Sequence, residues 1–236
     1  SQVRRHPDRI AVSDDDGALS YGDLWEAAGR IAAAVRDRVE PGQVVGLAVT
    51  PGRWLLAAVL GIARSACAWA PLDPQHPVSR LAHQCRDAGM AAIVADAESG
   101  EGLAGLGVPI LPLSTALEAE PRPGLEEPPR DALAYVRYTS GSTGAPKGVD
   151  VAHGALGALL AAMRREPGLH EDDVMVSVTS HVFDIAELEL LLPLVVGARV
   201  RIAPAGCVAD GDRLRELLSR ESGTVLQATP TTWRLL

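Results

Sequence analysis

The chain has few of the residues and segments that would assign it to several common classes of protein. Its three cysteines, Cys67, Cys85 and Cys207, are odd in number and far apart, which excludes a disulfide framework and a zinc motif of standard spacing. We expect them to be buried, reduced thiols. No apolar run reaches the ~18 residues of a membrane-spanning helix, and the N-terminus has no signal-peptide pattern. These absences predict a cytoplasmic protein that does not enter a membrane.

The chain also lacks an excess of basic residues. Its 22 Lys and Arg are outnumbered by 30 Asp and Glu, which gives a formal net charge of −8. The basic surface of a nucleic-acid-binding protein is therefore not expected. Aromatic residues make up only 3% of the chain, and no tandem repeat or low-complexity tract is present. A hydrophobic content of 47% with 22% charged residues is typical of a globular protein.

Apolar and amphipathic segments alternate along the chain, and this alternation predicts an α/β fold of layered, mostly parallel sheets flanked by helices. The near-continuous apolar run at 44–49 is typical of a strand buried on both faces. Strands are expected at 10–13, 44–49, 91–95, 108–111, 132–136, 174–178, 200–203 and 224–227, and helices at 24–35, 54–65, 79–87, 153–165, 185–195 and 213–220.

Local signals divide the chain further. Ser20 and Asp23 have the spacing of a capping box, with Asp in place of Glu, so a helix is expected to begin there. The proline-punctuated segment 68–74 is expected to be a turn. A Pro- and Glu-rich connection at 121–130 separates a first βα portion, 1–130, from a second, 131–236. The chain begins without Met and ends inside an apolar segment, so both ends are expected to be cut from a longer protein.

Residues 138–149, Tyr-Thr-Ser-Gly-Ser-Thr-Gly-Ala-Pro-Lys-Gly-Val, combine three glycines, four Ser or Thr side chains and one lysine. Glycine allows close approach of the backbone to a ligand, and consecutive N–H groups form an anion-binding concavity. A loop of this composition between a strand and a helix is expected to hold phosphate groups. It is not a Walker P-loop, because Pro146 stands where the second glycine is required and Gly148 follows the lysine. Taken alone, the pattern is equally consistent with a flexible connection.

The same segment resembles the signature loop of the adenylate-forming enzymes, the superfamily of acyl-CoA synthetases, luciferases and nonribosomal peptide synthetase adenylation domains. Three more segments are similar to motifs of that superfamily in the same order. They are Leu-Ser-Tyr-Gly-Asp-Leu at 19–24, Ala-Trp-Ala-Pro-Leu-Asp-Pro at 68–74 and Phe-Asp-Ile-Ala-Glu-Leu-Glu at 183–189, and 224–230 resembles a later strand of the substrate pocket. The sequence departs from the motifs at Arg137, Asp150 and Ala186, and Arg137 puts a charge next to an expected buried strand.

The resemblance implies that a carboxylate attacks the α-phosphate of ATP to give an acyl-adenylate and pyrophosphate. It assigns the hydroxyls of Thr139, Ser140, Ser142 and Thr143 and the backbone of Gly141 and Gly144 to the β and γ phosphates. Lys147 would neutralise charge on the leaving pyrophosphate. Mg²⁺ is implied by the ATP chemistry, but no metal ligand can be assigned in this sequence.

The resemblance also implies an amino-acid site. Asp184 would pair with the α-amino group of the substrate, since a carboxylate in a dry pocket needs a cationic partner; the alternative role is a helix N-cap. Ile185, Leu188 and Gln227 would line the side-chain pocket. The order Asp, Ile, Leu, Gln resembles the beginning of the pocket pattern of glycine-activating domains, in which bulky residues exclude larger side chains.

His181 is the second candidate catalytic residue. The resemblance places it near the substrate carboxylate and ATP, and a structural histidine is the alternative. Glu187 is expected to face solvent, and Glu189 to be structural.

The sequence is therefore identified as the N-terminal part of an amino-acid adenylation domain of a nonribosomal peptide synthetase, an ATP-dependent ligase of antibiotic biosynthesis. Its product would be loaded onto the phosphopantetheine of a peptidyl carrier protein, next to condensation or other synthetase domains. Later motifs and the small C-terminal domain of the family are absent from 1–236, so this segment alone is expected to be inactive. Two alternatives stay open, a free-standing acyl or aryl acid CoA ligase and a non-catalytic core that serves as an interaction module.

Overall fold

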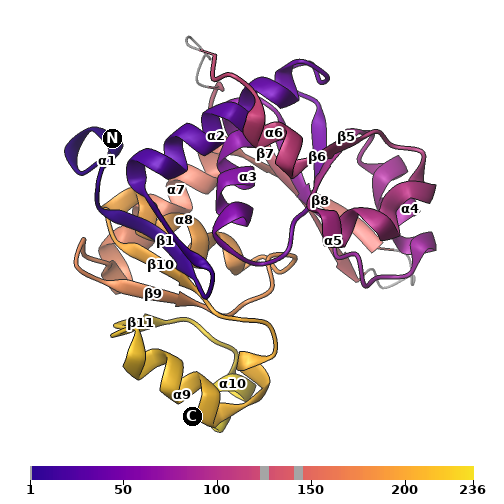
Figure 1. Ribbon diagram of the computed structural model, residues 1–236. Helices are drawn as coiled ribbons and strands as arrows, with labels where there is room; N and C mark the ends of the chain where they lie inside the picture. The colour runs from indigo at the N-terminus through magenta and orange to yellow at the C-terminus, as the bar shows by residue number, and fades with distance from the viewer. Residues whose placement is uncertain (1, 123–127, 141–145) are drawn as a thin grey trace. The chain divides into compact units, whose positions relative to one another are not determined.

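A computed structural model describes residues 2–122, 128–140 and 146–236. These residues form two compact units that alternate along the chain. Figure 1 labels the helices and strands and colours them by residue number. The first unit combines Ser1–Trp25, Pro51–Leu56 and Ala158–Leu236, and the second combines Glu26–Thr50 and Ala57–Gly157. The division of the chain at residue 130 concerns the order of motifs in the sequence and stays a prediction.

The second unit is built on a six-stranded sheet with the order β6-β5-β3-β4-β7-β8. Neighbouring strands are parallel except for the hairpin of β7 and β8, which is antiparallel. The strands are β3 (Val44–Ala48), β4 (Ala68–Pro71), β5 (Met90–Ala95), β6 (Ile110–Pro112), β7 (Leu133–Ser140) and β8 (Pro146–Ala152).

The first unit is built on a five-stranded sheet with the order β11-β9-β10-β1-β2. Here too the strands are parallel except at one edge, where β1 and β2 form an antiparallel hairpin. The strands are β1 (Ile10–Asp14), β2 (Gly17–Ser20), β9 (Val174–Ser177), β10 (Arg199–Ile202) and β11 (Val225–Leu226).

Helices connect most of the strands, as parallel neighbours require. None of the helices in the described ranges is long and apolar enough to cross a membrane. The α-helices are α1 (Gln2–Arg5), α2 (Tyr21–Arg36), α3 (Arg53–Arg64), α4 (Val78–Asp87), α5 (Ala97–Gly100), α6 (Leu113–Glu118), α7 (His153–Met163), α8 (Ala186–Val196), α9 (Gly211–Arg220) and α10 (Pro230–Leu235). Shorter 3-10 or π turns occupy Glu101–Leu106, Arg164–Gly168 and Cys207–Ala209.

The predicted α/β class is confirmed, and the capping box predicted from Ser20 and Asp23 is present at the start of α2. The backbone N–H of Asp23 donates to Ser20 Oγ at 3.0 Å, and the N–H of Ser20 donates to Asp23 Oδ2 at 3.2 Å. This reciprocal pair satisfies donors that the first turn of the helix leaves open. The buried strand predicted at 44–49 is found as β3 (Val44–Ala48), and every residue of it is buried. The three cysteines are free and buried, as expected.

Two segments differ from the sequence prediction. Residues 68–71 form the buried strand β4 and not a turn, because Pro71 is the last residue of the strand and Pro74 lies beyond it. Residues 146–152 form β8, so the phosphate-loop segment connects two antiparallel strands and not a strand and a helix. β8 is an edge strand with several exposed residues, and backbone pairing with β7 holds it without a recognisable apolar pattern.

Two helical glycines allow a matched test of the packing. A Cβ at Gly61 in α3 would lie 2.6 Å from the Ile31 side chain and 3.1 Å from the carbonyl of Ala28 in α2, whereas a Cβ at Gly157 in α7 would meet no atom within 4 Å. We expect Gly61→Ala to lower the free energy of unfolding by about 1–3 kcal/mol through overpacking. Gly157→Ala should raise it by about 0.5–1 kcal/mol, because Ala favours a helix over Gly. Denaturant unfolding of both variants measures these changes, and equal effects of the two substitutions would contradict the close packing of α2 and α3.

Candidate functional site

The candidate phosphate-binding residues lie at the end of the β7–β8 hairpin. Thr139 of β7 is the register partner of Lys147 of β8, and Ser140 is the partner of Pro146. Gly141, Ser142, Thr143 and Gly144, which complete the predicted set, lie outside the described residues, as does Ala145.

Thr139 and Lys147 form an exposed polar pair on this hairpin. Directly opposed residues of antiparallel strands project to the same face of a sheet, so the hydroxyl and the ammonium group are presented together. The next pair, Tyr138 and Gly148, projects to the opposite face, and both residues are half-buried. The exposed part of this face is confined to the end of the hairpin, since Arg137, two residues before Thr139 on the same face, is 4% exposed.

The candidate amino-acid site is a cavity of about 390 Å³ in the first unit. A volume of this size lies within the usual range for small-molecule sites, about 300–1,000 Å³. Residues after β9, the turn before α8 and residues after β11 surround the cavity. Its lining comprises Val178, Thr179, Ser180, Phe183, Asp184, Ile185, Val208, Ala228, Thr229 and Thr232.

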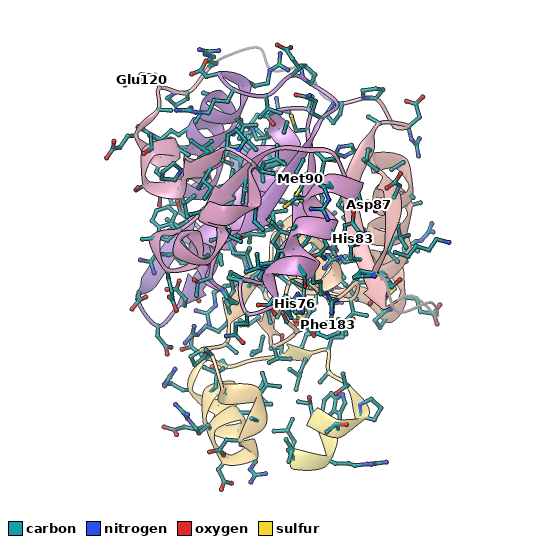
Figure 2. The ribbon with its side chains drawn as sticks, turned by 90° about the vertical axis from the view of Figure 1, so that its right-hand side faces the viewer. His76, His83, Asp87, Met90, Glu120 and Phe183 are labelled. Atoms are coloured by element: carbon teal, nitrogen blue, oxygen red, sulfur yellow. The ribbon has the colours of Figure 1, made fainter. Side chains whose placement is uncertain are left out.

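Asp184 lies in the turn that precedes α8 and lines this cavity. The N-cap position of α8 belongs to Ile185, and no side chain makes a capping hydrogen bond there. The alternative role of Asp184 as an N-cap is therefore wrong. Asp184 is exposed, as is its neighbour Phe183, which is labelled in Figure 2. Within the described ranges its carboxylate has no hydrogen-bond partner, so it is available to a cationic ligand.

Glu189, in the first turn of α8, is completely buried and accepts several hydrogen bonds. The backbone N–H groups of Val178 and Thr179 donate to its Oε2 at 2.9 and 3.0 Å. The Thr179 hydroxyl donates to Oε1 as well. Hydrogen bonds to an ionised acceptor are stronger than neutral ones. The carboxylate therefore fixes the segment after β9, which forms one wall of the cavity.

Gln227 connects the opposite wall of the cavity to the same carboxylate. Its Nε2 donates to Glu189 Oε1 at 3.1 Å and to the carbonyl oxygen of Ile185 at 2.9 Å. Both N–H groups of the amide are thereby used within the protein. Gln227 thus holds the end of β11 against the turn that carries Asp184. Both Gln227 and Leu188 were predicted to line the pocket, and neither is among the lining residues of the cavity; Leu188 is half-buried in α8.

His181 is buried and lines a second cavity of about 170 Å³ in the same unit. The two cavities share the wall formed by residues 178–180 together with Val208. The structure thus brings His181 and Asp184 to neighbouring cavities on either side of one segment. The smaller cavity is also bordered by Pro204, Ala205 and Gly206, which follow β10.

Two charged residues, Glu187 and Arg137, are buried. Glu187 is 4% exposed, so the prediction that it faces solvent is wrong; α8 is buried on most of its surface and does not have one polar side. Arg137, which departs from the family motif, is 4% exposed within β7. Its guanidinium lies 5.5 Å from the ring centroid of Tyr135, a distance at which a cation is attracted to an aromatic face.

The described residues provide no group of three or more His, Cys, Asp or Glu side chains that could hold a metal ion. A divalent cation that accompanies a nucleotide would therefore find no preformed cluster of protein ligands in this part of the chain.

Comparisons of the sequence identify related proteins over the whole chain. A family model described as AMP-binding enzyme matches residues 1–236. The chain is 35% identical over 238 residues to the dimodular nonribosomal peptide synthase of Bacillus subtilis (strain 168), a match that covers 98% of the chain and 10% of the synthase. It is 34% identical over 238 residues to syringomycin synthase SyrB1 of Pseudomonas syringae pv. syringae, with 99% of the chain and 38% of that protein covered.

The fold is similar to solved structures of the same kind. The nonribosomal peptide synthetase FmoA3 matches with a TM-score of 0.92 at 32% identity, over 100% of this chain and 25% of its own. Holo-AB3403, a four-domain nonribosomal peptide synthetase bound to AMP and glycine, matches with a TM-score of 0.89 at 33% identity, over 100% of this chain and 17% of its own. The chain thus spans less than half the length of each of these relatives.

The buried carboxylate can be tested by an isosteric substitution. Glu189→Gln would place an amide NH₂ group against hydrogen-bond donors, so we expect a loss of about 2–3 kcal/mol in the free energy of unfolding. Glu216→Gln on α9, an exposed position, should change it by less than about 0.5 kcal/mol. Denaturant unfolding measures both values. A Glu189→Gln protein as stable as the Glu216→Gln control would contradict the role given to the carboxylate.

Proposed function

The chain belongs to the AMP-binding enzyme family, and we propose that it forms the N-terminal part of an amino-acid adenylation domain of a nonribosomal peptide synthetase. In the proposed reaction a carboxylate oxygen of the amino acid attacks the α-phosphorus of ATP. The bond from that phosphorus to the bridging oxygen breaks, and pyrophosphate leaves with the electron pair. The products are aminoacyl-AMP and pyrophosphate.

One observation carries the amino-acid specificity of this proposal, namely the carboxylate of Asp184 at the open cavity. The carboxylate has no partner in the described part of the chain. An α-ammonium group would give it a charge-assisted hydrogen bond and would hold the substrate carboxylate in a fixed direction. Fatty-acyl and aryl acids carry no ammonium group, so this feature favours an amino acid over the substrates of a CoA ligase.

The exposed pair of Thr139 and Lys147 supports binding of the polyphosphate. Lys147 would place a positive charge beside the oxygens on which charge accumulates as pyrophosphate leaves. Thr139 and Ser140 would donate hydroxyl hydrogen bonds at the base of the loop. Gly141, Ser142, Thr143 and Gly144 complete this proposed set. His181 would contribute from its cavity by orienting the substrate carboxylate or the α-phosphate.

Glycine is the substrate that the pocket residues favour. The amide N–H groups of Gln227 are engaged by Ile185 and Glu189, so this side chain occupies space and does not bind a polar substrate side chain with those groups. Ile185, which lines the cavity, is apolar. The four-domain nonribosomal peptide synthetase holo-AB3403, whose structure is similar to this chain, is bound to AMP and glycine. We therefore propose glycine as the substrate, held by its amino and carboxyl groups.

The remaining components of the reaction are also proposals. Mg²⁺ would enter with ATP and keep mainly phosphate and water ligands. The aminoacyl group would pass to the phosphopantetheine of a peptidyl carrier protein, with condensation or other synthetase domains as neighbours. Residues 1–236 alone are proposed to be inactive in adenylation.

The experiment that tests the function is ATP–pyrophosphate exchange by the intact protein that contains this chain. We expect exchange that depends on an amino acid, with glycine preferred over bulky amino acids in a panel. Preference for a bulky amino acid would contradict the pocket assignment. CoA-dependent consumption of an adenylate formed from a fatty or aryl acid would support the alternative ligase, and failure to exchange with any acid would support a non-catalytic core.

Two substitutions should affect the amino-acid site and the phosphate-binding residues separately. Asp184→Asn removes the charge that pairs with the ammonium group, so we expect the KM for the amino acid to rise by about tenfold or more with little change in the KM for ATP. Lys147→Ala should lower kcat by about tenfold or more, because charge on the leaving pyrophosphate is no longer neutralised. Arg86→Ala, an exposed position on α4, serves as the control. Initial rates of pyrophosphate exchange measure all three, and unchanged rates for Lys147→Ala would refute its assignment.

A further inference from the structure

Helix α4 contacts the β7–β8 hairpin directly at the end that carries Thr139 and Lys147. In Figure 1 α4 lies beside β8, and the two elements are in contact. No motif in the sequence connects α4 with phosphate binding. Two of its side chains nevertheless bond to hairpin residues that are adjacent to this pair.

The first contact is between Asp87 and Tyr138. The Tyr138 hydroxyl lies 2.8 Å from Asp87 Oδ2, to which it donates, and 3.2 Å from the carbonyl oxygen of Gln84. Burial and the neighbouring Asp87 carboxylate raise the pKa of the Tyr138 phenol above its ordinary value, so the phenol keeps its proton and acts as the donor. Tyr138 precedes Thr139 directly, which makes this contact an anchor for the end of β7.

The second contact is between His83 and Pro146. His83 Nε2 lies 3.0 Å from the carbonyl oxygen of Pro146. A carbonyl oxygen only accepts, so Nε2 carries the hydrogen and donates it. Pro146 precedes Lys147, and the His83 ring also meets the Tyr138 ring edge to face, with centroids 6.4 Å apart. Figure 2 shows His83 and Asp87 on α4, where their spacing of four residues places them on one face.

Gly148 completes this arrangement. It is the register partner of Tyr138, and a Cβ at this position would lie 3.4 Å from both Asp87 Oδ2 and Tyr138 Cζ. The Tyr138–Asp87 pair therefore sits against the backbone of β8, immediately after Lys147. Both strands of the hairpin are held by the same face of one helix.

We propose that His83 and Asp87 are positioning residues for phosphate binding, and that α4 fixes the Thr139–Lys147 pair through Pro146 and Tyr138. This inference rests on the proposed function of that pair. Neither residue touches the nucleotide; each holds a hairpin residue adjacent to one that does. Since a displacement of about 1 Å can reduce a rate by about a hundredfold, loss of these contacts should weaken the use of ATP without changing the amino-acid site.

The kinetic test uses pyrophosphate exchange by the intact protein. Asp87→Ala and Tyr138→Phe are each expected to raise the KM for ATP by about fivefold to tenfold, while the KM for the amino acid changes by less than about twofold. The double variant should be no worse than the stronger single variant, because both changes break one contact. Asp87→Asn should have a KM for ATP close to that of the wild type, since its amide oxygen still accepts a hydrogen bond from the phenol. His83→Gln, which keeps an N–H donor, should be closer to the wild type than His83→Ala.

The control on the same helix is Arg86→Ala. The Arg86 side chain is exposed, so this substitution should leave both KM values unchanged. Wild-type KM values for ATP in the Asp87 and Tyr138 variants, additive effects in the double variant, or equal increases in both KM values would overturn the inference.

A second measurement keeps the inference separate from the proposed function. Hydrogen–deuterium exchange of the β8 amides at 147–152 should be about tenfold faster in Asp87→Ala than in the wild type, because local opening becomes easier. Amides of β3 and β5 should be unaffected. If the wild type shows no pyrophosphate exchange, the proposed function fails. The hydrogen–deuterium exchange result then tests by itself whether α4 holds the hairpin. Unchanged protection of β8 would overturn the role of α4.

Discussion

The buried carboxylate of Glu189 is the interaction on which the candidate amino-acid site depends. It accepts hydrogen bonds from the backbone at Val178 and Thr179 and from the amide of Gln227. These donors come from the end of β9 and the end of β11, which are neighbouring parallel strands. A carboxylate without solvent is stable only when such donors surround it. The constraint fixes both walls of the cavity and leaves Asp184 as the carboxylate that is exposed to a ligand.

Both sheets place their candidate ligand-binding residues where regular pairing ends. In the five-stranded sheet the site residues follow the carboxyl ends of parallel strands, as is usual in α/β proteins. In the six-stranded sheet they lie on an antiparallel hairpin at the edge, where Lys147 stays exposed. An edge strand has little side-chain burial of its own, so its position depends on what packs against it. The contacts of His83 and Asp87 from α4 supply that support.

Much of the fold could be predicted from local patterns, and the rest depended on tertiary contacts. The apolar run at 44–49 and the Ser20–Asp23 capping box act within a few residues, so the sequence alone was sufficient for them. β8 was missed because backbone pairing at a sheet edge needs no apolar periodicity. Glu187 was placed in solvent because helical spacing does not tell how many faces of a helix are covered.

The candidate site could be predicted from resemblance to a family and not from composition. Asp184 and Lys147 were named from motifs, whereas their surroundings came only from the structure. The bond from Gln227 to Glu189 joins residues 38 positions apart, and the contact of Asp87 with Tyr138 spans 51 positions. No short-range pattern encodes such pairs.

The most direct test of the account is a structure of the intact protein with a non-hydrolysable analogue of glycyl-AMP. We predict that the α-ammonium group of the analogue lies within about 3 Å of the Asp184 carboxylate, the usual hydrogen-bond distance, with the Glu189 contacts unchanged. An ammonium group bound elsewhere, with Asp184 still facing solvent, would contradict the central claim that this carboxylate selects an amino acid.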